Sequence, residues 1–196
     1  MPARKGTIPF FVTISVILST VIAGLFLVLH VFMPVRVLSR FALRDEILPI
    51  SITVYGRGSD TISARLALYT ADWTVLNTVE RSWPGWEISI EALVIQSGTG
   101  NIVFPLTVRT DQTRAGQGIP ITRYYDRSDF PALYERIGIS SRERSALRRL
   151  FFLARHGLWV STRTGRFRQG RAVLREFQTG TEYFLFVDRS GRLSFR

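Results

Sequence analysis

The sequence predicts an N-terminal transmembrane helix followed by a mainly-β domain, a β-sandwich or barrel-like α+β fold with an inserted helical pair. Three observations support this fold class. The 26 residues from Ile8 to Met33 include no charged side chain. Short segments that alternate apolar and polar residues follow, separated by turns rich in Gly and Pro, as in antiparallel sheets. Near residues 129–156 the apolar residues change to a helical period.

The apolar run defines the start of the predicted domain organisation. As a helix it would extend about 39 Å, enough to cross a hydrocarbon core of about 30 Å with some tilt. It is longer than the apolar region of a cleaved signal peptide, which has about 7–15 residues. We therefore expect residues 1–6 to form a cytoplasmic tail, 7–33 a transmembrane signal anchor and 34–49 a stalk.

The orientation of this anchor rests on the N-terminal tail. Basic residues occur on both sides of the run, and their number does not separate the two sides. A short basic tail with Arg4 and Lys5 before one long apolar run is typical of an export signal. We therefore expect a single-pass protein of the cell membrane, here a bacterial inner membrane, with its domain outside the cytoplasm.

A stripe of small residues lies within the predicted anchor. Ser15, Ser19 and Ala23 have the spacing i, i+4, i+8, which places them on one face of a helix. Small residues allow two transmembrane helices to approach closely. The stripe predicts helix–helix association within the bilayer.

Residues 50–196 are predicted to form the β-rich domain. Trp86–Gln96 alternates clearly, so we expect a half-buried strand with Glu87, Ser89 and Glu91 on its wet face. Tyr183–Val187 is apolar on both faces, which is typical of a central strand. Further strands are expected at Ile50–Tyr55, Ile62–Tyr69, Trp73–Arg81, Ile102–Arg109, Leu158–Thr162, Ala172–Phe177 and Leu193–Phe195.

Two helices are predicted within this domain, near residues 129–138 and 141–156. Pro131 and Gly138 bound the first helix. Ser140 and Glu143 form a capping box for the second. The pair, with Gly-Ile-Ser between its helices, resembles a helix-turn-helix, and a nucleic-acid binder facing the cytoplasm is therefore one alternative. The third helix that such a DNA-reading unit needs is missing from the pattern.

Charge is unevenly distributed along the chain. Residues 1–44 carry a net charge of +5, residues 45–133 carry −3 and residues 134–196 carry +9. A basic amphipathic helix with adjacent aromatic residues is typical of surfaces that face anionic lipid headgroups or an acidic protein partner; a solvated helix face is the alternative. The candidate interaction surface comprises Arg144, Arg148, Phe152, Arg155, Arg166, Phe167 and Arg168.

The residue inventory offers few reactive groups. There is no cysteine, Lys5 is the only lysine, and His30 and His156 are the only histidines. A Ser–His–acid triad would need His156. This histidine lies in the last turn of a predicted helix, where its interaction with the helix dipole accounts for its presence. Glu87 and Glu91 share a strand face, but about 13 Å separates their backbones, too far for neighbouring catalytic carboxylates. We therefore assign no catalytic, cofactor-binding or metal-ligating residue and expect no cofactor.

These observations favour a binding or scaffolding module anchored in the cell envelope. An extracytoplasmic enzyme that uses carboxylates is the competing hypothesis. A cleft with two acidic groups in catalytic range would favour the enzyme, and a continuous apolar or basic patch would favour binding.

Overall fold

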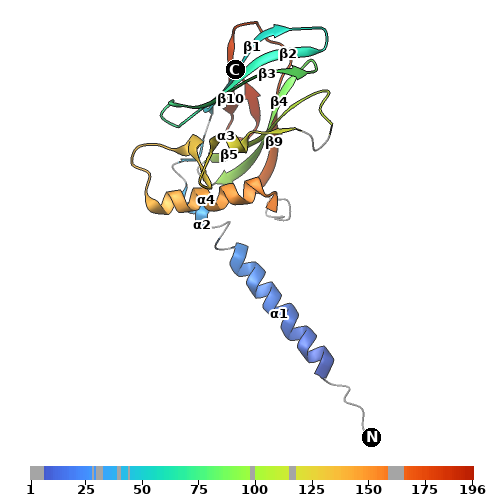
Figure 1. Ribbon diagram of the computed structural model, residues 1–196. Coiled ribbons are helices and arrows are strands. Elements are labelled where there is room, and N and C mark those ends of the chain that lie inside the picture. Colours follow the sequence, from blue (N-terminus) through green and yellow to red (C-terminus); the bar gives the residue numbers. More distant parts are fainter. Residues whose placement is uncertain are drawn as a thin grey trace.

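The chain is mainly β, with several antiparallel sheets and a few helices (Figure 1). The computed structural model describes residues 7–27, 29, 33–38, 41–43, 45–97, 100–114, 118–158 and 166–196, and within α1 (Thr7–Leu27) it describes the side chains of residues 11–26.

A five-stranded sheet has the strand order β11-β10-β1-β2-β3. Its members are β1 (Glu46–Arg57), β2 (Thr61–Tyr69), β3 (Val75–Pro84), β10 (Glu182–Val187) and β11 (Leu193–Phe195). The first three form a meander, and β10 joins β1 from the far end of the sequence. The prediction that Tyr183–Val187 forms an interior strand is confirmed, since β10 lies between β11 and β1.

A four-stranded sheet has the order β6-β5-β4-β9, and a small third sheet pairs β7 with β8. The bounds are β4 (Ile88–Ser97), β5 (Gly100–Thr110), β6 (Ile119–Pro120), β7 (Asp126–Arg127), β8 (Phe130–Pro131) and β9 (Phe167–Leu174). β4 is more deeply buried than its alternation suggested: Ser89 is fully buried and Glu87 is only 9% exposed. Arginine side chains cover the face that we expected to be wet.

The two larger sheets contribute to one hydrophobic core. Ile52 and Leu66 of the first sheet and Ile88 and Val108 of the second line the same small internal space. The sheets approach closely where β9 meets β11, because a Cβ on Gly170 would lie 2.9 Å from Leu193. The absence of a side chain at position 170 therefore permits this contact.

Residues 34–49, which the sequence suggested as a stalk, contribute directly to the domain. They include most of α2 (Met33–Val37) and the start of β1. Val35, Leu38 and Phe41 are at most 5% exposed. Leu43 also exchanges backbone hydrogen bonds with Asn101, which attaches this segment to β5.

The region between β5 and β9 contains one long helix, α4 (Ser141–Arg155), which confirms the helix predicted at 141–156. The helix expected near 129–138 is absent. The chain there forms β8 and a 3₁₀ turn (Ala132–Tyr134), preceded by the short helix α3 (Thr122–Tyr125). Ser128 and Asp129 adopt positive φ in a tight turn, which is incompatible with the predicted helix start. Most of the strand predicted at Leu158–Thr162 lies outside the described residues.

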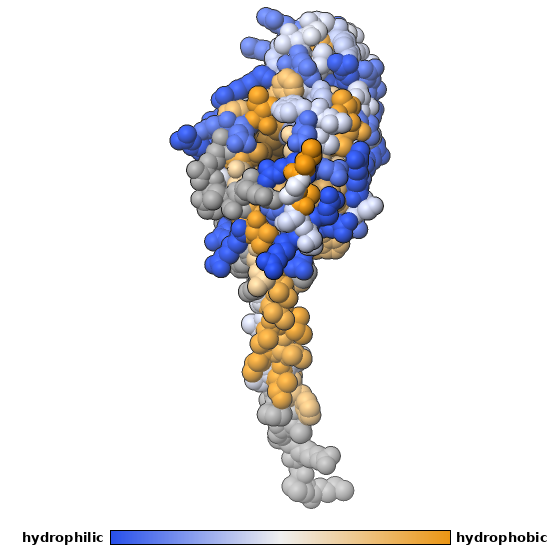
Figure 2. Space-filling view, turned by 90° about the vertical axis from the view of Figure 1, so that its left-hand side faces the viewer, coloured by the Kyte–Doolittle hydropathy of each residue, from blue (hydrophilic) through white to orange (hydrophobic). Residues whose placement is uncertain are grey.

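α1 projects from the end of the domain where α2 and α4 lie (Figure 1). Its large apolar side chains from Phe11 to Phe26 are 42–65% exposed, and Figure 2 shows them as a continuous apolar stem. Among the residues described, no helix is both long and apolar enough to cross a membrane.

Candidate functional site

α4 is the element on which most of the candidate surface residues lie. Ser140 caps its start: the Glu143 backbone N–H donates to Ser140 Oγ at 3.3 Å, and the Ser140 N–H donates to Glu143 Oε2 at 2.9 Å. The predicted capping box is therefore present. Its apolar side packs on the domain through buried side chains: Ala146, Leu147, Leu150, Phe151, Leu153 and Ala154.

The position of α4 places it beside the junction with α1. α4 lies across the end of the domain from which α1 projects (Figure 1). Arg149 Nη1 donates a hydrogen bond to the Leu29 carbonyl oxygen at 3.1 Å. A groove lies between α2 and α4. Met33, Pro34 and Val37 of α2 line one side, and residues of α4 that include Arg142 and Arg149 line the other.

Two of the arginines predicted for the interaction surface are engaged within the domain. Arg155 forms ion pairs with Asp126 and with Asp129. Arg144 lies 3.8 Å from Glu135, and its guanidinium lies 4.5 Å from the centre of the Phe130 ring. These contacts attach α4 to the segment before it. Arg144 and Arg155 therefore have structural partners, all within residues 126–135.

The outward face of α4 retains Arg148 and Phe152, and the structure adds Arg142 and Arg149 to them. All four side chains are exposed, Phe152 by 44%, and the Phe152 ring lies 4.4 Å from that of His156. The candidate surface predicted from the sequence does not include Arg142 and Arg149. A helical projection contained the signal, but only the packing of α4 on the domain shows which arc faces out.

The remaining predicted surface residues lie at the start of β9. Phe167 is half-buried and packs against the core, whereas Arg166 and Arg168 are exposed. The Arg166 carbonyl accepts a hydrogen bond from the Gln96 N–H, which extends the pairing of β4 with β9. Residues 159–165, directly before Arg166, lie outside the described residues.

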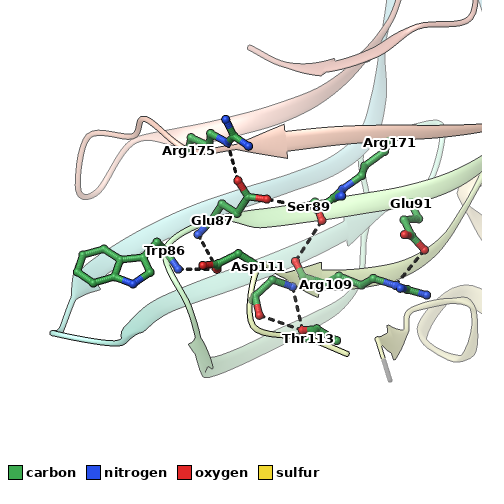
Figure 3. Close-up of polar contacts among 10 residues, drawn as sticks. Trp86, Glu87, Ser89, Glu91, Arg109, Asp111, Thr113, Arg171 and Arg175 are labelled. Atoms are coloured by element: carbon green, nitrogen blue, oxygen red, sulfur yellow. Dashed lines mark hydrogen bonds and ion pairs between the residues drawn. The ribbon is translucent and has the colours of Figure 1, made fainter. Parts of the chain in front are cut away.

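A cluster of carboxylates and arginines covers β4 (Figure 3). Glu87 lies 3.2 Å from Arg171 and 2.5 Å from Arg175, both contributed by β9 or its end. Glu91 lies 3.0 Å from Arg109 of β5. Each glutamate that we considered for acid–base catalysis is thus paired with a guanidinium and links β4 to a neighbouring strand.

Asp111 belongs to the same cluster and holds the turn between β3 and β4. Its Oδ1 accepts from the Trp86 N–H at 2.7 Å and from the Glu87 N–H at 3.3 Å (Figure 3). Burial alone acts to raise the pKa of Asp111, but hydrogen bonds from these backbone amides outweigh it, and the pKa is lowered. A Cβ at Gly85, where φ is +118°, would collide with Asp111. Asp111 therefore stabilises the turn between β3 and β4.

A pocket of about 270 Å³ opens between the segment before β1 and the β2–β3 turn. Its walls are mainly aromatic and aliphatic, and Arg136 and Glu46 supply the charges. Arg136 lies 4.0 Å above the centre of the Phe41 ring. Trp73 is 51% exposed and adopts a φ of +60° at the turn. The other lining residues are Ala42, Leu43, Ile47, Leu48, Pro49, Ala71, Val103, Leu133 and Tyr134.

Two buried tyrosines form hydrogen bonds with the backbone of β5, and one of them, Tyr134, also lines this pocket. Tyr134 Oη donates to the Val103 carbonyl at 2.7 Å and accepts from the Val103 N–H at 2.8 Å. Tyr125 Oη donates to the Pro105 carbonyl at 2.6 Å. Burial raises the pKa of both tyrosines, so both stay neutral donors at neutral pH.

No group of three or more candidate metal ligands occurs in the part of the chain that the structure describes. No family model, curated protein or solved structure matches this chain.

Proposed function

We propose that this chain is a single-pass membrane-anchored envelope protein whose β-rich domain acts as a binding or scaffolding module outside the cytoplasm. The binding role rests on one observation, the aromatic pocket beside Trp73. The pocket combines apolar walls with one arginine and one glutamate, a composition typical of ligand sites. The carboxylates of the β4 face, in contrast, are engaged in ion pairs.

α1 is the proposed anchor. Its 21 helical residues correspond to about 32 Å, close to the thickness of a hydrocarbon core. The part of α1 with described side chains, residues 11–26, is about 24 Å long and falls short of a crossing by itself, so the proposed anchor rests on the 26 uncharged residues from Ile8 to Met33. Its exposed apolar side chains are favourable in lipid, and exposed in water they would form a patch of the kind that marks a membrane contact. Ser15, Ser19 and Ala23 are exposed on it and form the proposed contact with a second helix.

The anchor is tested by two charges placed in α1. We expect the native chain to remain in the membrane pellet after alkaline carbonate extraction. Ile17→Asp with Val21→Asp should release it, because a carboxylate near the bilayer centre costs about 3 kcal/mol. The matched control, Ile17→Leu with Val21→Leu, should stay in the pellet. Release of the native chain would refute the anchor.

The binding role is tested by a photo-crosslinking amino acid at Ile47, which lines the pocket and is 45% exposed. We expect a discrete mass increase on irradiation of intact cells, and we expect Ala71→Trp to abolish it by filling the pocket from its rim. The same crosslinker at Val173, an exposed site on β9, serves as the control. An adduct that is absent, or that survives Ala71→Trp, contradicts a ligand in the pocket.

A further inference from the structure

We infer that the outward face of α4, formed by Arg142, Arg148, Arg149 and Phe152, binds anionic phospholipid headgroups of the leaflet from which α1 emerges. This α4 face would fix the orientation of the domain on the membrane. The inference rests on the proposed anchor, but it holds for either orientation of α1, since α4 and the domain lie on the same side.

The α4 face is a single continuous arc. At 100° per residue, its four side chains fall within about 120° around the helix, with Phe152 between Arg148 and Arg149. Ser145 is also exposed and lies near the centre of the arc. An aromatic side chain flanked by arginines suits the interface, because the ring enters the headgroup layer while the guanidinium groups bind phosphates.

The arginines of α4 form two groups, one with carboxylate partners and one without. Arg144 and Arg155, at the margin of the helix, pair with carboxylates of residues 126–135. Within the described chain, no ion pair joins the three arginines of the α4 face to a carboxylate. The hydrogen bond from Arg149 is to the Leu29 carbonyl, a neutral acceptor, so its positive charge stays uncompensated.

The position of the α4 face favours lipid over a protein as its partner. The bond between Arg149 and Leu29 joins it to the segment directly after α1. Met33 and Val37, both exposed apolar side chains, line one side of a groove whose other side includes Arg142 and Arg149 of the α4 face. α4 lies across the domain end that α1 leaves (Figure 1), so a bilayer crossed by α1 faces this arc. Near an anionic bilayer each arginine contributes a factor of about 5 in binding.

The test uses the full chain in lipid nanodiscs. Because the chain has no cysteine, Ser145→Cys gives one labelling site at the centre of the α4 face. An environment-sensitive fluorophore at this site is read against nitroxide groups on the lipid headgroups. We expect strong quenching in discs that contain phosphatidylglycerol, weaker quenching in pure phosphatidylcholine, and loss of the difference in high salt.

Substitutions test whether binding depends on the residues of the α4 face or only on the net charge of the domain. Arg142→Gln, Arg148→Gln and Arg149→Gln together should shift the ratio of docked to undocked domain on the order of 100-fold toward the undocked state. Phe152→Ala should reduce quenching and keep its salt dependence. The control triple is Arg57→Gln, Arg81→Gln and Arg175→Gln, which removes the same charge near the C-terminal end of β1, a strand about 40 Å long. This triple should leave the quenching unchanged.

The outcomes distinguish the two proposals. A chain that fails to co-purify with the discs overturns the anchor, and the inference falls with it. A chain that inserts but shows equal quenching with both lipids overturns the α4 inference alone. An equal loss in both arginine triples overturns the assignment to these residues. If the partner of the α4 face is an acidic protein and not lipid, the chain would insert but its quenching would not depend on the lipid, and the α4 inference would again be overturned.

Discussion

Two tyrosine hydroxyls form hydrogen bonds with backbone groups along the edge of β5. β6 pairs with β5 only at Thr107 and Val108, and Leu43 pairs with it at Asn101. Between these points, Tyr134 and Tyr125 satisfy backbone groups of Val103 and Pro105. Two side chains thus provide hydrogen bonds that a neighbouring strand would otherwise supply.

We predict that Tyr134→Phe destabilises the domain by about 1–3 kcal/mol, because it leaves the buried N–H and C=O of Val103 without this partner. Thermal unfolding of the full chain in detergent checks the value. Tyr124→Phe is the matched control, since among the described residues its hydroxyl accepts only from Arg123, at the surface. Equal effects of the two substitutions would contradict the role given to Tyr134.

The same tyrosines predict a loss of stability in alkali. Burial raises the pKa of Tyr125 and Tyr134 above the unfolded value of about 10. The stabilisation is therefore complete below about pH 10 and declines above it, where only the unfolded chain ionises readily. We expect the melting temperature to fall above pH 10, and to fall less steeply in Tyr125→Phe. Phenolate absorbance from both buried rings near pH 10 in the folded protein would contradict this.

At the scale of elements, α4 shows how local and tertiary signals combine. Its start was predictable because Ser140 and Glu143 satisfy each other's backbone donors within four residues. The failed helix near 129–138 shows the opposite case. Pro131 and Gly138 are typical helix boundaries. Between and beside them, however, Phe130, Leu133 and Tyr134 are each buried in the core without forming a helix.

We predict that Ser140→Ala lowers the stability of the domain by about 1 kcal/mol through loss of the helix cap. For a domain of this size, the melting temperature should drop by about 2–4 °C. Ser141→Ala, one residue further along the exposed start of α4, should change it little. A drop for Ser141→Ala and none for Ser140→Ala would exclude the observed cap.

At the scale of the whole molecule, the proposed orientation predicts which residues are accessible from outside. We expect a cysteine at Ser59, in the exposed turn between β1 and β2, to react with a membrane-impermeant maleimide in spheroplasts. A cysteine at Ala3 should react only after lysis. The reverse pattern would place the domain in the cytoplasm and contradict the proposed orientation.

The sequence alone determined the mainly-β class, most strands and the long helix, because alternation, helical period and capping are local patterns. It did not determine how β10 joins β1, how β9 joins β4 or how residues 34–49 enter the core, since these depend on contacts between distant segments. The tertiary structure also decided which arginines matter. Arg144 and Arg155 bind carboxylates brought close by folding, while the packing of α4 leaves Arg142, Arg148 and Arg149 facing outward. Helical period arranges charges around a helix, but the surface on which the helix packs decides which of them reach a partner.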